Sequence, residues 1–308
     1  MLHRRPVVYR GLVKLRALSF IGYGFTDNSD FVVSPGSAGA SREQVVRALF
    51  DHMFQNQKLW DEILLTQLTD ASPNFEFVQR ETKRKGYDVA AEKLIACPYI
   101  EIRGDFETYY GGLRQNLKHD VARKSRRLAE QGLEPDFEAI TRVDDNALME
   151  LRELNRKRFE ATGHRSFFLR DDRFAFLREL AVVFTERQRW LLFLFRVKGR
   201  LVAYHLCFAY NDAVYDWNTS YDLDYSLYSL GKILLKPVLE YCFEKGHKVF
   251  DFMAGDEDYK LKWTEKMRTN YQIAVRRRNL KTGLMKSYFS IKRRAQRTKT
   301  LPGISNPT

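Results

Sequence analysis

The chain has 308 residues, of which 44% are hydrophobic and 14% aromatic; this composition excludes a disordered or low-complexity protein and suffices for two modest domains or one large α/β unit. The formal net charge is +13, but no acid follows Glu265, and the 12 Lys and Arg residues from Lys266 onward leave 40 Lys and Arg against 39 Asp and Glu before them. The excess charge therefore belongs to the tail, which would attract phosphates, acidic polymers or anionic lipid without selecting one of them.

The first half of the chain alternates between strand and helix patterns. We expect strand, helix, strand, helix and one or two final strands at residues 14–22, 41–55, 60–68, 73–85 and 87–102. Ser41 is the expected N-cap of the first helix. The second half repeats this order but opens with a hairpin. The first half has no counterpart of this hairpin, which predicts that the amino-terminal half is truncated.

A basic segment, residues 105–131, separates the two halves and is predicted to form one long helix or two, with Gly111 and Gly112 as the break. Its cations are Lys118, Arg123, Lys124, Arg126 and Arg127. Such a run is typical of a solvated helix face and equally of a surface that contacts substrate.

The second half has the clearer pattern. Helices are predicted at residues 144–162, 172–186 and 229–244, and strands at 190–197, 201–210, 214–220, 248–253 and 270–278. Pro237 lies inside the predicted helix 229–244 and should kink it, because proline cannot donate a backbone hydrogen bond.

The segment Ser229, Leu230, Gly231 and Lys232 joins a strand to a helix. The first backbone N–H groups of a helix have no internal partners, so an anion can bind there. Gly231 would let a pyrophosphate approach the backbone closely. The segment therefore predicts a cofactor-binding turn, although an ordinary helix start capped by Ser229 has the same pattern.

Five segments carry a resemblance to a known family: Tyr109–Leu128, Gly199–Ala203, Tyr215–Tyr221, Ser229–Gly231 and, most specifically, Phe250–Lys260. They are similar to the GNAT-like acetyltransferases related to the cellulose-biosynthesis protein CelD and, more distantly, to the FemAB aminoacyl transferases. The resemblance covers residues 99–278 well and 14–98 only by element order.

The resemblance implies an α/β (α+β) fold of two GNAT-like halves, with mixed central sheets flanked by helices. We expect an incomplete amino-terminal half at residues 1–104, the acyltransferase domain at 105–280 and a basic amphipathic tail at 281–308. The donor would be acetyl-CoA or another acyl-CoA, held between splayed strands at 213–220 and 248–253 with its pyrophosphate at the turn 228–232. That turn has one glycine, fewer than the full acetyl-CoA signature.

Acyl transfer needs a group that takes a proton from the attacking amine or hydroxyl, donors for the oxyanion and a proton for the leaving thiolate. Asp251, between Phe250 and Phe252 in an apolar strand, is a candidate base, and equally a structural carboxylate bonded to backbone or to Lys260. His205 shares a strand face with small neighbours and could transfer protons, although a core histidine is the commoner case.

Four further residues complete the predicted site. Tyr259 could protonate the thiolate, and Lys260 could bind phosphate or pair with Asp251; both could also be surface residues beside a turn. Asp216 and Asn218 alternate with aromatic residues, which predicts a polar, substrate-binding strand face. A wetted edge strand would have the same pattern.

Cys97, Cys207 and Cys242 lack metal-ligand or disulfide spacing, so we expect neither a structural metal nor a disulfide framework. No apolar run approaches a membrane span and the start lacks the apolar core of a secretory signal, which favours a cytoplasmic chain. The basic amphipathic pattern of residues 284–294 could contact the inner face of a membrane or pack on the body.

These observations predict acyl transfer, foremost of acetyl, to an amine or hydroxyl of a small-molecule or glycan-type acceptor such as a polysaccharide or cell-envelope precursor. Two alternatives stay open. One is aminoacyl transfer from charged tRNA to a cell-wall precursor. The other is a non-catalytic GNAT-like module whose basic tail binds nucleic acid or membrane.

Overall fold

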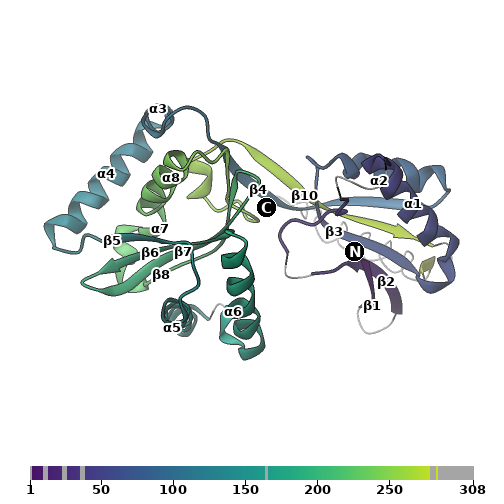
Figure 1. Cartoon of the computed structure of the whole chain (residues 1–308), viewed down its shortest axis with the longest axis horizontal. Coiled ribbons are helices and arrows are strands. Elements are labelled where there is room, and N and C mark those ends of the chain that lie inside the picture. Colours follow the sequence, from purple (N-terminus) through teal and green to yellow (C-terminus); the bar gives the residue numbers. More distant parts are fainter. Residues whose placement is uncertain are drawn as a thin grey trace, which may run out of the picture. The chain divides into compact units, whose positions relative to one another are not determined.

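A computed structural model describes residues 2–9, 13–22, 26–34, 39–163, 166–277 and 282–283. The chain divides into two compact units (Figure 1). Unit 1 combines the residues up to Ile95 with those from Arg268 onward, and unit 2 is the continuous segment Ala96–Met267.

Unit 1 is a mixed sheet in the strand order β1-β2-β3-β10-β4. Its strands are β1 (Leu2–Tyr9), β2 (Val13–Phe20), β3 (Glu62–Thr69), β10 (Met267–Arg276) and the first part of β4 (Asp88–Glu101). β2 and β3 are parallel, whereas β1 with β2 and β3 with β10 are antiparallel. β4 then continues into unit 2.

The prediction that the first half lacks an opening hairpin is wrong. β1 and β2 pair over their whole length, from Leu2 opposite Phe20 to Tyr9 opposite Val13. β1 was not predicted because two arginines and Pro6 are untypical of a strand. The strand tolerates the proline because it lies at the edge of the sheet. The reason for regarding this half as truncated therefore falls away.

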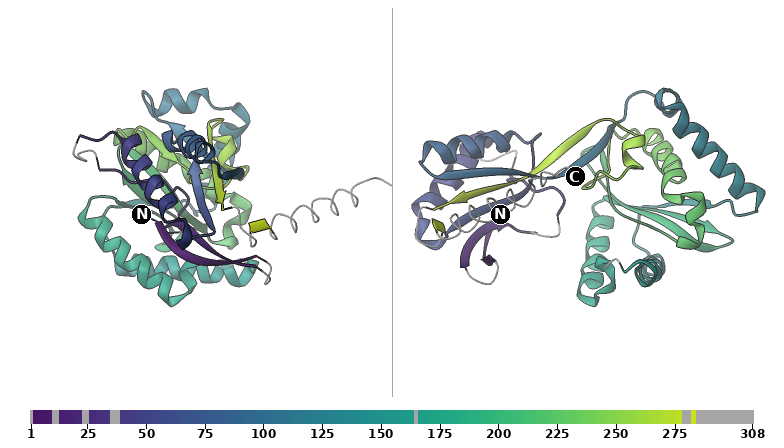
Figure 2. Two further views of the ribbon diagram at one scale, coloured as in Figure 1. Left: turned by 90° about the vertical axis from the view of Figure 1, so that its right-hand side faces the viewer. Right: turned by 180° about the vertical axis from the view of Figure 1, so that it is seen from behind.

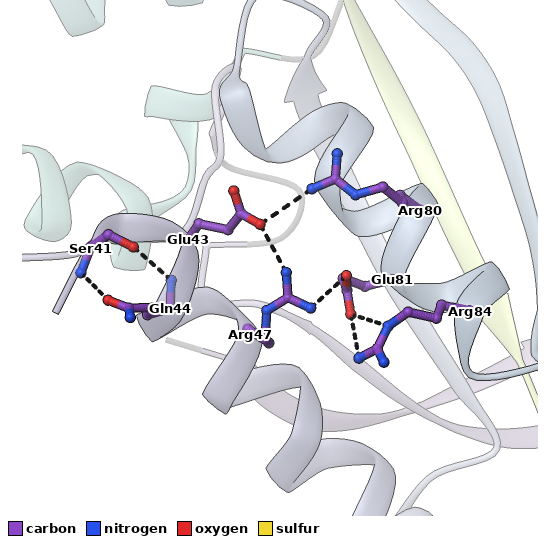
Figure 3. A network of polar contacts seen from close by, with 7 residues as sticks. All are labelled: Ser41, Glu43, Gln44, Arg47, Arg80, Glu81 and Arg84. Atoms are coloured by element: carbon purple, nitrogen blue, oxygen red, sulfur yellow. Dashed lines mark hydrogen bonds and ion pairs between the residues drawn. The ribbon is translucent and has the colours of Figure 1, made fainter.

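Helices α1 (Arg42–Gln55) and α2 (Pro73–Arg84) belong to unit 1. Ser41 caps α1 as predicted: its side chain accepts from the Gln44 amide and the Gln44 side chain accepts from the Ser41 amide. Figure 3 shows this capping box beside the ion pairs of the buried Glu81, one with Arg47 of α1 and one with Arg84 of the same helix, α2.

Unit 2 contains a second mixed sheet in the order β4-β9-β8-β7-β6-β5. Its remaining strands are β5 (Asp136–Ile140), β6 (Trp190–Val197), β7 (Arg200–Tyr210), β8 (Ala213–Tyr221) and β9 (Val249–Asp251). Only β8 and β9 are parallel among the pairs from β5 to β9. β5 was not predicted from the sequence; it is a short and largely exposed edge strand.

Helices cover both faces of this sheet (Figures 1 and 2). One face carries α5 (Asp145–Thr162) and α6 (Asp171–Glu186), whose apolar side chains share a core with β6 and β7. The other face carries α3 (Phe106–Gly112), α4 (Gln115–Glu130), α7 (Leu230–Ile233) and α8 (Leu235–Glu244). Short 3₁₀ helices lie at Gln57–Leu59, Phe167–Leu169, Leu223–Tyr228 and Lys260–Lys262.

Two predicted helical segments are each divided in the structure. The break in 105–131 falls between α3 and α4, directly after the predicted glycines. The predicted helix 229–244 is two helices that meet at Leu234. Pro237 therefore lies in the first turn of α8. The N–H groups of this turn have no partner within the helix, so a proline there costs no helical hydrogen bond. The proline follows a break between two helices and does not kink a continuous one.

The remaining α and β elements of the second half lie close to their predicted positions, apart from the strand expected at 248–253, which is shorter. The tail pattern at 284–294 falls outside the described residues. None of the helices that the structure describes is long and apolar enough to cross a bilayer.

Candidate functional site

The two parallel strands at the centre of unit 2 stay together for three residue pairs only. β8 and β9 pair from Ala213 and Val249 to Tyr215 and Asp251, after which β9 ends and β8 continues to Tyr221. The chain beyond β9 bonds to β4 instead, because the amide of Phe252 donates to the Pro98 carbonyl at 3.0 Å. The strands therefore part where the sequence predicted splayed strands.

Next to this parting, β8 contains a bulge. Its register against β7 shifts between the pairs Leu206–Asn218 and Cys207–Asp216, so β8 holds one residue more than β7 over this step. A bulge of this kind reverses the side-chain alternation beyond it. Asp216 consequently contacts His205 on one face of the sheet, whereas Asn218 accepts a hydrogen bond from Tyr204 on the other.

The predicted shared polar face of Asp216 and Asn218 is therefore wrong. The bulge gives each residue a different environment. Asn218 lies in a buried network with Tyr204 and Asn155, whose amide donates to the Tyr204 hydroxyl at 2.5 Å. Asp216 lies with His205 and Thr219.

His205, Asp216 and Thr219 form a hydrogen-bonded cluster, in which His205 is 1% and Asp216 6% exposed. His205 Nδ1 lies 3.1 Å from Asp216 Oδ2, and the Thr219 hydroxyl donates to Asp216 Oδ1 at 3.0 Å. Burial by itself would raise the pKa of the Asp216 carboxyl, but His205, Thr219 and the charge of Lys260 outweigh it and hold that pKa below its usual range.

An ionised Asp216 fixes the proton on His205 Nδ1, because a carboxylate can only accept. The other ring nitrogen, Nε2, makes no hydrogen bond within the part of the chain that the structure describes. An imidazole held by a carboxylate through one nitrogen, with a lone pair on the other, is the arrangement of a general base.

Tyr259 and Lys260 lie in the same neighbourhood, since the charge of Lys260 lowers the Asp216 pKa and that of Asp216 raises the Tyr259 pKa. Burial is the main cause that places the Tyr259 pKa far above its usual range, so this hydroxyl keeps its proton at neutral pH. The buried Lys260 ammonium lies 2.8 Å from Glu257 and donates to the Ala254 carbonyl at 3.2 Å.

Asp251 is fully buried at the last pair of β9, and its Oδ1 accepts the amide of Met253 at 2.9 Å. This contact helps to turn the chain after the strand. The hypothesis that Asp251 acts as a base stays a prediction.

The predicted cofactor turn has an unusual backbone. Ser229 is left-handed, with φ of 51°, and its hydroxyl accepts from the Lys124 ammonium and caps no helix amide. The Ser229 carbonyl accepts from Lys232 at 2.9 Å and from Ile233 at 3.3 Å. An ordinary capped helix start, the alternative interpretation of this segment, is therefore not what the structure contains.

The turn is also more cationic than its own residues suggest. Lys232 pairs with Asp120 of α4, and Lys124 lies 3.8 Å from the same carboxylate. Burial and the neighbouring Lys232 lower the pKa of Lys124, while Asp120 partly offsets this. Two partly buried ammonium groups thus share one carboxylate beside Ser229. The sequence contained Lys124 only as a member of the basic run, and nothing in it linked α4 to residue 229.

Replacing Asp120 by asparagine is expected to destabilise unit 2 by about 1 kcal/mol at pH 7, because two neighbouring lysines lose their counter-charge and solvent screens part of the effect. Lys232 chiefly lowers the pKa of Asp120 from 3.8 to about 2. The contribution is therefore complete above pH 4 and is lost as the pH falls towards 2.

Urea denaturation of the wild type and Asp120→Asn between pH 7 and pH 3 measures this effect. Glu130→Gln, which removes an exposed pair to Arg126 at 3.6 Å, is the matched control and should change stability little. A pH-independent difference between wild type and Asp120→Asn would contradict the assignment.

The splayed strands and the helices on both faces are the arrangement of a GNAT-like fold. Residues 115–261 match the family model described as an acetyltransferase (GNAT) domain. Over this part, just under half of its length, the chain is similar to that family. No curated protein sequence matches the chain.

Solved structures extend the likeness to the tandem arrangement. The C-terminal domain of a putative lysylphosphatidylglycerol synthetase from Agrobacterium fabrum has a TM-score of 0.57 at 12% identity, covering 92% of this chain and 88% of its own. FemX has a TM-score of 0.57 at 11% identity, with 88% of each chain covered. A tandem GNAT protein from the clavulanic acid biosynthesis pathway has a TM-score of 0.50 at 14% identity, covering 85% and 78%. The predicted fold of two GNAT-like halves is confirmed.

Proposed function

We propose that this protein transfers an acyl group, foremost acetyl, from acyl-CoA to an amine or hydroxyl of a small-molecule or glycan-type acceptor. The observation that carries the proposal is the His205–Asp216 pair beside the point where β8 and β9 part. The GNAT family match over residues 115–261 supports acyl transfer as the reaction class. A relation to CelD and an acceptor from polysaccharide or cell-envelope synthesis are part of the proposal.

The residues at the turn fit the pyrophosphate of such a donor. The amides of Leu230 and Gly231 precede the first bonded helix amide and make no hydrogen bond in the described part of the chain. A Cβ on Gly231 would have only Tyr221 within 4.0 Å, so the space beside the backbone is open. Lys124 and Lys232 supply positive charge once an anion competes with Asp120 for them.

Bound acyl-CoA would supply the acyl group activated as a thioester. His205 Nε2 takes the proton of the attacking amine or hydroxyl, while Asp216 orients the ring and stabilises the imidazolium that results. Tyr259 is protonated at neutral pH and is the proposed proton donor to the leaving sulfur. The proton gained by His205 then restores Tyr259, so the protein ends as it began.

Aminoacyl transfer from charged tRNA to a cell-wall precursor is the second candidate function. It is supported by the resemblance to FemAB proteins and by the fold that the chain shares with FemX. The same base would serve both reactions, because an aminoacyl ester and a thioester are attacked in the same way. The donor therefore decides between these two functions.

A non-catalytic module that binds nucleic acid, an acidic polymer or the inner face of a membrane through the basic tail is the third candidate. The tail lies outside the described residues, so this proposal rests on its sequence alone. A cytoplasmic location is likewise part of the proposal. Among the described residues, no group of His, Cys, Asp and Glu could hold a metal ion, and the proposed chemistry uses none.

The donor experiment combines melting temperature with product release. Acetyl-CoA is expected to raise the melting temperature of the purified chain, and free CoA thiol should appear when an acceptor amine is added. Mass spectrometry of small molecules that co-purify with the protein would identify a retained CoA species.

Indifference to every acyl-CoA, with loss of the aminoacyl group from charged tRNA, would replace the proposal by the second function. Indifference to both donors, with binding that depends on salt and on the tail arginines, would replace it by the third.

A further inference from the structure

A pocket lies in unit 2, apart from the His205–Asp216 pair. It has a volume of about 570 Å³, within the usual range for small-molecule sites. Its walls come from the end of β4, from α3 and from the segment 261–266. In the strand order, β9 separates β4 from β8, and no residue of the His205 cluster lines the pocket.

The wall formed by 261–266 is held by hydrogen bonds on both sides. The Tyr109 hydroxyl donates to the Trp263 carbonyl at 2.6 Å, and the Thr264 hydroxyl donates to the Tyr99 carbonyl at 2.7 Å. The Tyr99 amide in turn donates to the Lys266 carbonyl at 3.1 Å. The pocket is therefore a fixed feature of the fold, made between elements that the chain itself ties together.

The floor and the rim of this pocket differ in chemistry. Ile100, Tyr109, Leu113, Leu261 and Trp263 supply apolar and aromatic surface. Trp263 is fully buried, and its indole N–H has no hydrogen-bond partner among the described residues. A ligand with a flat apolar body suits such a wall.

The charged groups favour an anion. Four cations, Arg103, Arg114, Lys262 and Lys266, line the pocket against two carboxylates, Glu101 and Glu265, which leaves an excess of two positive charges. Both carboxylates are already paired: Lys266 lies 2.6 Å and Arg103 2.8 Å from Glu101, and Arg114 lies 2.5 Å from Glu265.

The lysines and arginines also keep the Glu101 carboxyl ionised, since Lys266 chiefly lowers its pKa. The Lys262 ammonium makes no ion pair or hydrogen bond to a described residue, so it is available to a ligand. Two guanidinium groups and a free ammonium are the donors that bind phosphate oxygens best.

We propose that this pocket binds a small phosphate monoester whose organic part is flat and apolar. The double negative charge of such a group matches the excess of two positive charges, and the aromatic wall holds its body. The proposed ligand site does not rest on the proposed transfer reaction, because no residue that lines the pocket belongs to the His205 cluster or to the turn 229–232.

Isothermal titration with phenyl phosphate tests this proposal, with inorganic phosphate and benzoate as comparison probes. Phenyl phosphate is expected to bind at least ten-fold more tightly than inorganic phosphate, which lacks the ring, and than benzoate, which carries one charge. Lys262→Glu should weaken phenyl phosphate binding ten-fold or more. Lys93→Ala, an exposed lysine of unit 1, is the matched control and should leave it unchanged.

Tryptophan fluorescence locates the bound probe. Phenyl phosphate should change the emission of the wild type but not of Trp263→Phe, which removes the one indole in the wall of the pocket. Equal affinity of wild type and Lys262→Glu would overturn the proposal, as would equal affinity for phenyl phosphate and inorganic phosphate or no binding of phenyl phosphate. Lys262 is exposed, so Lys262→Glu should leave the fold intact. The test therefore stands even where replacement of the buried Trp263 disturbs the fold.

Discussion

Replacing His205 with alanine is expected to lower kcat for acyl transfer by about 10²–10⁴-fold, the usual contribution of a general base. Acyl-CoA should raise the melting temperature of this variant as much as that of the wild type. The His205 ring hydrogen-bonds to Asp216 and Thr219 among the described residues, and neither belongs to the turn proposed to bind the donor. Steady-state kinetics and melting curves on the same preparation measure both effects.

The neighbouring carboxylate gives a sharper form of the test. Asp216→Asn can present an N–H to His205 Nδ1 and so reverse the tautomer, which should lower kcat by a similar factor and alter the dependence of kcat/KM on pH. A core histidine without a chemical role would change stability and leave that pH profile as it was.

Two further variants serve as comparisons. His119→Ala removes an exposed histidine of α4 and should leave turnover unchanged. Asp251→Asn tests the sequence-based hypothesis: a lower kcat with unchanged binding of acyl-CoA would give Asp251 a part in the reaction. Normal turnover in His205→Ala would remove the base assigned here.

Replacing Gly231 with valine is expected to abolish the rise in melting temperature that acyl-CoA causes. At a donor concentration of 100 times Kd this rise corresponds to about 2.7 kcal/mol. The variant itself should melt near the wild type, since only Tyr221, at 4.0 Å, borders the added Cβ. The loss would then reflect the blocked approach of the pyrophosphate to the backbone.

Gly111→Val is the matched control for this experiment, because Gly111 is also helical and has no atom within 4 Å of an added Cβ. Its response to acyl-CoA should equal that of the wild type. A normal response of Gly231→Val would mean that the turn is not where the donor binds.

Much of the fold was accessible from the sequence because local signals agree with the final structure. The capping residues Ser41 and Asp144, and Gly163 in left-handed conformation, fix the ends of their helices at the predicted places. Edge strands were harder to recognise, since β1 carries two arginines and a proline and β5 is short and largely exposed. The kink predicted at Pro237 was wrong for a different reason. A proline indicates that a helix is interrupted, but not on which side of the proline the helix breaks.

The sequence pointed to residues of the candidate site but not to their arrangement, and their roles stay predictions. His205, Asp216, Tyr259 and Lys260 were all singled out, and the structure brings them into one neighbourhood. Their relation depends on the bulge in β8, which leaves no local pattern in the sequence. Thr219 and Asp120 were missed because each also bonds to a residue far away in the sequence, Thr219 to His205 of β7 and Asp120 to Lys232 of α7.

The pairing of β10 with β3 has a consequence for how the protein folds during its synthesis. Thr69 and Asn270 are neighbours in the sheet of unit 1 although the whole of unit 2 lies between them in the chain. During synthesis the whole of unit 2 therefore leaves the ribosome before β10 does, and until then unit 1 lacks this interior strand. Until β10 is made, the edge of β3 that it will cover stays unpaired, and an unpaired strand edge can pair with another chain.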